Sequence, residues 1–309
     1  MNFSKIKTIP INNRKHKMNV SELGVVPNGD SFADFYDSLP DILGAKNIKQ
    51  IAKAVAIASN QGKEVILAMG AHPIKCGLSP VIINLMKQKI ITMVAMNGAG
   101  SIHDFELAYH GETSEDVAST LQDGSFGMVE ETGQVLNETM NEGVKNSIGA
   151  GASVGALISA SKYKHSNLSI QAAGITYGVD ITVHIAIGTD TIHVHPAADG
   201  AVLGKSSHLD LMKFSDHIAK LEGGVYINLG SAVLLPEVFL KSLSAVRNLG
   251  HEVLHFTTVN MDMNIQYRPS ENVLKRPALT GATAYNLLGH HEIMLPLLAS
   301  AIILEKARL

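Results

Sequence analysis

The sequence predicts an α/β protein built on a doubly wound, mostly parallel, Rossmann-like sheet. Short apolar runs recur along the chain, and each stops at a glycine or a polar residue, which is typical of strands buried on both faces of a parallel sheet. Segments with helical periodicity separate these runs, and this alternation favours a wound sheet over a sandwich or a helical bundle. No linker rich in Pro or Ser divides the 309 residues. Residues 46–309 are therefore predicted to form one domain.

The first 45 residues show a different pattern. They are polar and irregular, with a basic Lys-His-Lys triplet at 15–17 and a Pro-Asn-Gly-Asp turn at 27–30, and no helical or strand period persists in them. We expect residues 1–45 to form an N-terminal arm that leads into the domain.

In chain order, the strands are predicted at residues 65–69, 90–96, 181–187, 225–229 and 253–259. The helices are predicted at residues 48–58, 113–121, 129–146, 151–163, 207–222, 235–249 and 290–306. In an open parallel sheet, ligands bind outside the carboxyl ends of the strands. The residues placed at those ends are small or polar, so they are the first candidates for a site: 70–72, 97–100, 188–190, 230–231 and 257–258.

The composition excludes several classes of protein. With 46% hydrophobic and 17% charged residues, the chain can bury a core, so it is not a disordered protein. Lys and Arg are scattered and the formal charge is −3, which argues against nucleic-acid binding. No apolar stretch approaches the roughly 20 residues that cross a bilayer, and no signal peptide opens the chain. We expect no membrane association, a cytoplasmic location and, because charged side chains are scarce, a homo-oligomer.

The turn at residues 97–104 is a candidate contact for a phosphate or a ribose. Small residues follow a predicted buried strand there, and Asp104 comes after them. Glycines allow a close approach of the backbone to a phosphate, and a helix that starts at the turn adds its positive end. Close packing without a ligand is the alternative. The segment does not follow the G-x-G-x-x-G pattern of ordinary dinucleotide sites.

Histidines gather between residues 184 and 195. His193 and His195 are two positions apart, so on an extended segment they face the same side and could chelate a metal with Asp190 or Asp199. Hydrogen bonds to backbone carbonyls or to a cofactor amide are the alternative. A second pair, His290 and His291, opens the last predicted helix, where the helix dipole favours neutral imidazoles.

Two further features have a functional and a structural interpretation. The only cysteine, Cys76, cannot form an internal disulfide, and its place at the start of a predicted helix suits either a nucleophile or a small buried side chain. The acidic residues between 112 and 131 are predicted to be solvated surface.

Six segments resemble, in the same order, motifs of the deoxyhypusine synthase family. The likeness extends from about residue 64 to 300. Residues 69–77 correspond to the family's strand and Ser-Asn turn, 98–105 to T-A-G-G-x-E-E-D, 180–190 to I-P-V-F-x-P-A-x-T-D-G-S, 229–232 to L-G-G-G, 268–271 to Arg-Pro-Asp-Glu, and 289–298 to A-D-A-x-x-x-x-P-L-L.

The resemblance implies a doubly wound NAD-binding fold, assembly as a homodimer or homotetramer, and a transferase activity. The family oxidises a small-molecule amine with NAD and transfers the resulting group through a lysine imine. In this sequence Lys275 would be the nucleophile, with an exposed loop lysine as the alternative. His193 or His195 would be the proton carrier, and Asp104 or Glu271 the group that orients the substrate. The implied NAD contacts are Gly70, Ala71, His72, Gly98, Ala99, Gly100, Asp104, Asp190, Gly230, Ser231, Thr257, Thr258, Gly289 and His290.

The departures from the family affect the amine half of the site. Leu235-Pro236 replaces a Lys-His pair, no Trp is present to hold a polyamine, and His103 and His195 stand where the family has carboxylates. We therefore expect a deoxyhypusine-synthase-like, NAD-dependent transferase whose amine substrate is not spermidine. The alternatives are a metal-dependent hydrolase centred on the histidines, including His184, and a non-catalytic NAD-binding paralogue.

Overall fold

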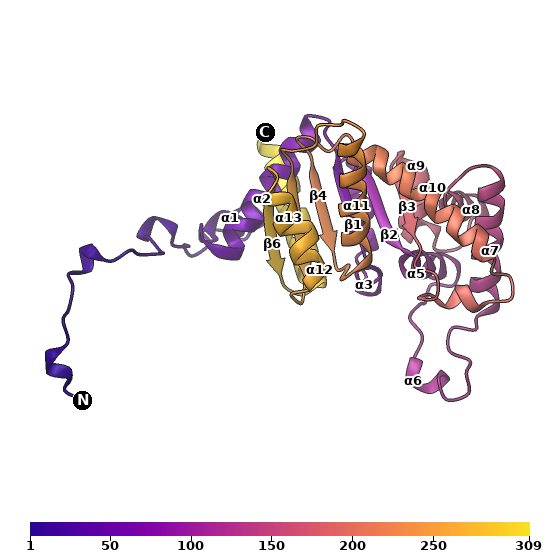
Figure 1. Ribbon diagram of the computed structural model, residues 1–309, viewed down its shortest axis with the longest axis horizontal. Helices are drawn as coiled ribbons and strands as arrows, with labels where there is room; N and C mark the ends of the chain where they lie inside the picture. Colours follow the sequence, from indigo (N-terminus) through magenta and orange to yellow (C-terminus); the bar gives the residue numbers. More distant parts are fainter.

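The computed structural model describes residues 1–309, and its centre is one six-stranded sheet (Figure 1). The strand order is β3-β2-β1-β4-β5-β6, and all neighbouring strands are parallel. This is the order of doubly wound dinucleotide-binding sheets, in which the winding reverses between β1 and β4. The predicted fold class is confirmed. The strands are β1 (Val65–Met69), β2 (Met93–Asn97), β3 (Asp180–His184), β4 (Val225–Leu229), β5 (Thr257–Asp262) and β6 (Thr283–Leu288).

Helices cover both faces of the sheet, and none is long and apolar enough to span a bilayer. The longer ones are α2 (Leu43–Asn60), α4 (Ser79–Lys87), α5 (Gly98–Tyr109), α7 (Glu130–Lys145), α8 (Ala150–Ser161), α9 (Ile170–Tyr177), α10 (Gly200–Ile218), α11 (Leu234–Asn248) and α14 (His291–Arg308). The shorter ones are α1 (Phe32–Ser38), α3 (His72–Lys75), α6 (Val117–Thr120), α12 (Tyr267–Pro269), α13 (Arg276–Ala278), the 3-10 turns η1 (Phe3–Lys5), η2 (Ile11–Asn13), η3 (Val20–Glu22), η4 (Ser166–Leu168) and η5 (Thr191–Val194), and the π-helical turn η6 (Ser270–Lys275).

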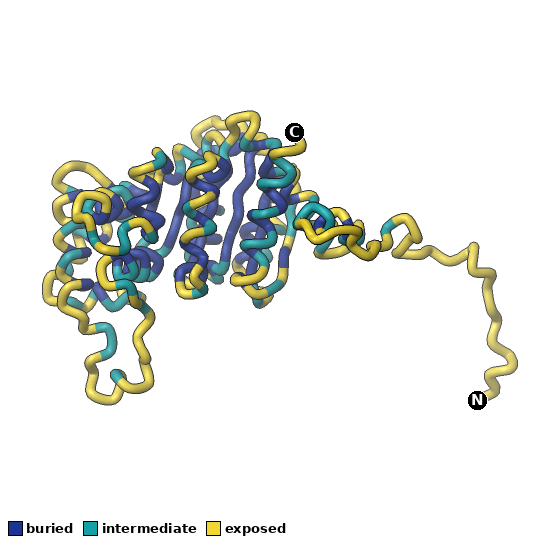
Figure 2. The backbone as a smooth tube through the Cα atoms, turned by 180° about the vertical axis from the view of Figure 1, so that it is seen from behind, coloured by how far each residue is buried: buried dark blue, intermediate teal, exposed yellow.

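The central strand explains why the apolar runs are continuous. All five residues of β1 are buried. Val65, Leu67 and Met69 belong to the larger apolar core, whereas Ile66 and Ala68 point into the smaller core on the α10–α11 face. Both faces of each central strand are covered by helices, so neither face needs polar residues. Figure 2 shows these strands buried between the helical layers.

Two segments project from the body (Figures 1 and 2). Residues 1–21 are exposed and extend away from it, whereas Val25 donates a backbone hydrogen bond to Ser38 and Arg308 of α14 pairs with Asp37 of α1. The extended part of the arm is thus shorter than the 45 predicted residues. At the other end of the sheet, residues 110–129, which we call the α5–α7 loop, project with α6.

Three predicted strands differ from the structure by three or more residues at one end: 90–96 begins at Met93, 181–187 ends at His184, and 253–259 is displaced to Thr257–Asp262. The apolar run 253–259 begins in a loop, where Val253 and Phe256 are buried in the smaller core. Strand β5 starts only at Thr257, which pairs with Val225 at the first position of β4. Thr257 and Thr258 therefore lie at the amino edge of the sheet, opposite the strand ends at which a cofactor contact was predicted.

Candidate functional site

Three adjoining cavities open beyond the carboxyl ends of β1, β2 and β3. We call them the inner cavity, about 230 Å³, the acidic cavity, about 470 Å³, and the α4 cavity, about 570 Å³. Ser114 lines all three, Glu106 lines the inner and acidic cavities, and Lys75 lines the inner and α4 cavities. Residues of the α5–α7 loop line each of the three cavities, so this single loop joins them into one site.

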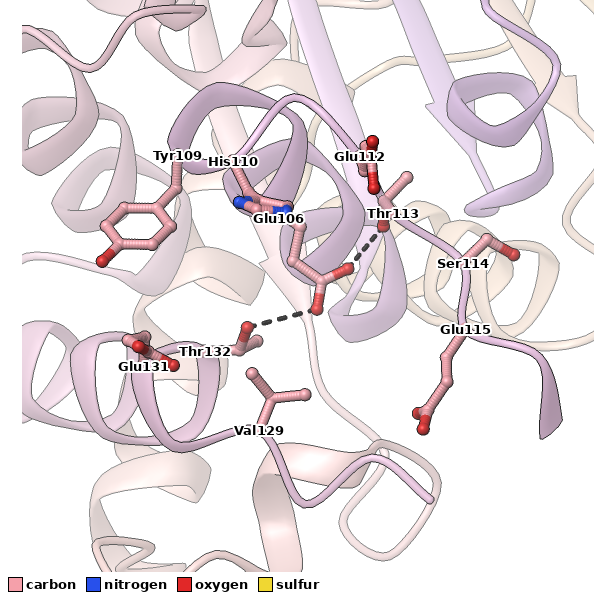
Figure 3. Close-up of a pocket in the computed structure, with 10 residues that line it drawn as sticks. All are labelled: Glu106, Tyr109, His110, Glu112, Thr113, Ser114, Glu115, Val129, Glu131 and Thr132. Atoms are coloured by element: carbon pink, nitrogen blue, oxygen red, sulfur yellow. Dashed lines mark hydrogen bonds between the residues drawn. The ribbon is translucent and has the colours of Figure 1, made fainter. Parts of the chain in front are cut away.

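The acidic cavity is lined by four glutamates and by no Lys or Arg (Figure 3). Glu106 comes from α5, Glu112 and Glu115 from the α5–α7 loop, and Glu131 from α7. Glu112, Glu115 and Glu131 are exposed, as predicted for this acidic stretch. The fold of the loop also gathers them around a cavity, which was not predicted. A signal was present in the sequence, since no Lys or Arg occurs between residues 90 and 144.

Glu106 holds the two ends of the α5–α7 loop together. Its carboxylate accepts hydrogen bonds from Thr113, at the start of the loop, and from Thr132, at the start of α7, the latter at 3.2 Å (Figure 3). His103 Nδ1 lies 2.6 Å from Thr113 Oγ1. Burial alone would raise the pKa of Glu106, but the nearby His103 ring and the Thr113 hydroxyl outweigh it and lower that pKa.

This network also determines which ring nitrogen of His103 donates a hydrogen bond to Thr113. The single hydroxyl proton of Thr113 goes to Glu106, so Thr113 Oγ1 can only accept from His103 Nδ1–H. In the neutral form of this tautomer, Nε2 is the nitrogen that can accept a proton. Because His103 lines the inner cavity, it is an imidazole base held by a carboxylate through a hydroxyl. In the sequence, His103 stands out only as the replacement of a carboxylate of the deoxyhypusine synthase family.

The N-terminus of α5 is occupied by a carboxylate of the protein itself. A Cβ at Gly98 would lie 2.1 Å from Asp190 Oδ2, and the Ala99 N–H hydrogen-bonds this carboxylate. Burial raises the pKa of Asp190, while His193 and His103 act in the opposite direction. A phosphate contact at residues 98–100 would have to displace this group. Ala99 and Asp190 themselves line the inner cavity.

The histidines of the 184–195 segment do not form one cluster. His193 Nδ1 accepts hydrogen bonds from the N–H groups of Gly188 and Asp190, and its Nε2 lies 3.7 Å from Asp190 Oδ2. His195 packs against Gly133 and accepts from the Ala197 N–H.

His184 is buried edge-on against Phe214, and burial lowers its pKa to about 3. The three imidazoles thus face different surroundings, and no group of three His, Cys, Asp or Glu side chains is arranged to hold a metal. The geometry does not support the metal-dependent hydrolase alternative.

Asp104 has a structural role and lines none of the three cavities. It is fully buried, and its carboxylate accepts from Ser169 Oγ at 2.6 Å and from the N–H groups of Ile170 and Gln171 at 2.7 and 3.0 Å. It therefore caps the N-terminus of α9. Burial raises its pKa to about 6. The prediction that this side chain contacts cofactor or substrate is not supported.

Several of the predicted cofactor contacts lie close together beyond β1 and β4, where the winding of the sheet reverses. A Cβ at Gly70 would lie 2.6 Å from the Gly230 carbonyl oxygen. Gly230 itself has a φ of +64°, and a Cβ added to it would meet the ring of His291. The rings of His72 and His291 are 5.2 Å apart. Ala71 and Ser231 adjoin these glycines, and Gly289 and His290 lead into His291. His291 was not among the predicted contacts, yet it is buried and neither ring nitrogen has a partner.

Lys275 and Glu271 lie apart from the cavities. Both belong to η6, which packs beside β5 and β6, whereas His193 and His195 follow β3 at the other edge of the sheet. The Lys275 side chain is 64% exposed, and its Nζ is 3.2 Å from Glu271 Oε1. Within one chain, the predicted nucleophile and the predicted proton carriers are not brought together. An exposed, ion-paired ammonium also lacks the desolvation that activates a lysine.

Cys76 is a poor nucleophile. Its Sγ lies 3.2 Å from His72 Nε2. Burial and the nearby Glu292 carboxylate raise the pKa of the thiol, so the less reactive protonated form is favoured.

Comparison with known proteins identifies the fold and no family. Neither a scan against family models nor a search of curated proteins finds a match. Among solved structures, the LOR/SDH protein of Methanococcus maripaludis S2 aligns over 93% of this chain and 74% of its own, with 16% identity and a TM-score of 0.53. At this identity the likeness shows a shared fold alone.

Two longer proteins share the same fold. AgrE, crystallised with ornithine and NAD+, aligns over 84% of this chain with 11% identity and a TM-score of 0.53. ArgZ, an arginine dihydrolase from the ornithine–ammonia cycle in cyanobacteria, also aligns over 84%, with 14% identity and a TM-score of 0.51. This chain spans only 33% of the length of each. A deoxyhypusine synthase candidate from Entamoeba histolytica aligns at a TM-score of 0.44, which is too low to carry an argument.

Proposed function

We propose that this protein is an NAD-dependent enzyme that oxidises a small cationic amine in the connected cavities beyond β1, β2 and β3. The observation that carries the proposal is the lining of these cavities, which brings five carboxylates together at the edge of the sheet where dinucleotide-binding folds hold their ligands. A carboxylate-rich cavity attracts and binds ammonium groups. The structure of AgrE with ornithine and NAD+ adds support from the same fold.

The residues at this edge fit a dinucleotide. The strand order matches, the cavities reach the size of ordinary ligand pockets, and one of them is lined by Ser79, whose buried hydroxyl has no partner. Gly70, Ala71 and His72 after β1, with Lys75, would hold the cofactor. Bound NAD would supply the hydride acceptor.

The side chains around the acidic and inner cavities would bind the amine and move its proton. Glu112, Glu115 and Glu131 hold the ammonium charge, and Glu106 keeps the loop that carries the first two in place. His103 Nε2 accepts the proton that the amine loses when its C–H hydride departs. In this proposal His103 takes the role that the sequence suggested for His193 or His195.

We further propose that oxidation is followed by a transferase step. The resemblance to deoxyhypusine synthase suggests that the imine formed by oxidation is attacked by an acceptor amine, with release of the original amine. We propose a direct attack by the acceptor, because Lys275 lies outside the cavities. If the imine is instead hydrolysed, ammonia or a free amine appears without any acceptor.

The experiment is an assay of NADH formation with a panel of diamines and basic amino acids, combined with calorimetric titration of NAD. Binding of NAD together with turnover of a cationic amine supports the proposal. Binding without turnover of any amine would identify the chain as a non-catalytic NAD-binding paralogue. Absence of NAD binding would overturn the proposal.

A further inference from the structure

We propose that the α4 cavity binds a phosphate group through Lys75, through the Ser79 hydroxyl and N–H, and through the N-terminus of α4. The inference rests on the proposed function, since the pyrophosphate of NAD is the phosphate that we expect there. It assigns Lys75 and Ser79 a role that the sequence patterns had not indicated.

Lys75 is the only Lys or Arg among the residues that line the three cavities. It forms no ion pair within the chain, although Glu112 lines the same α4 cavity. The remaining charged side chains of the cavities are carboxylates, which repel a phosphate. The end of the site beside Lys75 therefore favours an anionic group, and the end lined by the glutamates favours a cationic group.

Ser79 supplies two hydrogen-bond donors without acceptors. The residue is only 3% exposed, lines the α4 cavity, and its hydroxyl has no partner. Its N–H donates to no acceptor, because it is the first residue of α4, and Pro80 follows it without any N–H. A buried hydroxyl left unpaired costs free energy. An oxygen of a phosphate would satisfy both donors and interact with the positive end of this nine-residue helix.

The backbone between the two residues leaves room for a ligand. Gly77 lines the same cavity, has a φ of +74°, and a Cβ added there would meet no atom within 4 Å. The turn at residues 75–79 thus has a cation at one end, in Lys75, and two hydrogen-bond donors at the other, in Ser79. Between them, the backbone at Gly77 carries no side chain that would block a ligand.

The test uses calorimetric titration of the full-length protein with NAD, inorganic pyrophosphate and adenosine. The variants are Lys75→Met and Ser79→Ala, and Lys87→Met is the control because Lys87 is in the last turn of α4 and lines none of the cavities. We expect each of the two test variants to weaken NAD and pyrophosphate binding by roughly tenfold or more, as loss of a hydrogen bond to a charged group does. Adenosine, which has no phosphate, should bind all four proteins equally.

Melting temperature separates ligand binding from a structural role. Ser79→Ala removes an unpaired buried hydroxyl, so its melting temperature should equal or exceed that of the wild type, whereas a structural hydroxyl would lower it. Equal binding of NAD and pyrophosphate by wild type and both variants would overturn the phosphate site and leave the proposed function standing. Lys75-dependent binding of pyrophosphate without binding of NAD would support the phosphate site and overturn the proposed function.

Discussion

The two halves of the sheet differ at their carboxyl edge. Beyond β1, β2 and β3 the chain encloses three connected cavities lined by carboxylates. Near the ends of β4, β5 and β6 polar side chains pair with one another, as Asn228 donates to Asn260 and Asn260 donates to Asn286, each at 2.9 Å. The predicted site residues are divided between these halves. The comparison shows that a strand end becomes a site only where the following segment moves away from the sheet and leaves space.

The largest expected effect concerns the stability of the half with the cavities. Asp210 of α10 accepts hydrogen bonds from Gly151 of α8 at 2.9 Å and from Val183 of β3 at 2.8 Å. Burial raises its pKa from 3.8 to about 7. The folded state thus keeps a proton that the unfolded state releases, so stability should fall as pH rises from about 4 to 7, by about 1.4 kcal/mol for each pH unit.

Asp210→Asn cannot titrate and should lose this slope. Urea unfolding at pH 5 and pH 7 measures it in both proteins. We expect the wild type to lose roughly 2 kcal/mol more than the variant between these two values. Parallel losses in the two proteins would show that the carboxyl group is ionised throughout and that its hydrogen bonds outweigh burial.

The second prediction tests where the chemistry lies. His103→Gln should lower the rate of amine oxidation about a hundredfold, because a positioned base contributes at least that much, while NAD affinity stays within about twofold. His208→Gln, on the exposed surface of α10, is the control and should leave both unchanged. A fully active His103→Gln enzyme would remove this residue from the mechanism.

The third prediction tests the boundary between the halves. An alanine at Gly70 would place its Cβ 2.6 Å from the Gly230 carbonyl oxygen, so β1 and β4 would have to separate locally. We expect a loss of about 2 kcal/mol in the free energy of unfolding. Gly204→Ala, inside α10 and with no atom within 4 Å of the added Cβ, should instead gain up to about 1 kcal/mol. Equal stabilities of the two variants would contradict the close approach.

The smallest effect is expected in the other half of the sheet. Lys275→Ala should keep turnover and NAD affinity within about twofold, and the loss of its exposed ion pair should cost at most about 0.5 kcal/mol. Borohydride reduction during turnover provides an independent check. An increase in mass at Lys275 would restore this lysine as the nucleophile and require that a second copy of the chain bring it to the cavities.

Strands with strong apolar patterns were predicted well, and weakly apolar ones were not. Residues 65–69 and 225–229 match β1 and β4 at both ends. Strand β6 was missed because it is the sheet edge and only one of its six residues is buried, so it lacks a continuous apolar run. The starts of β2 and β5 were placed three and four residues too early. Apolar residues of the preceding loops, such as Ile90 and Val253, are also buried, and the pattern alone does not separate loop from strand.

The sequence by itself determined the wound parallel sheet and the small residues after its strands, because burial on both faces imposes a local pattern that can be read along the chain. Which of those residues share a cavity was decided only by the tertiary structure. Strand order places Lys275 and His193 at opposite edges, and hydrogen bonds from Thr113 and Thr132 to Glu106 fold the α5–α7 loop back over the site. Both depend on contacts between distant segments, and such contacts leave no period in the sequence.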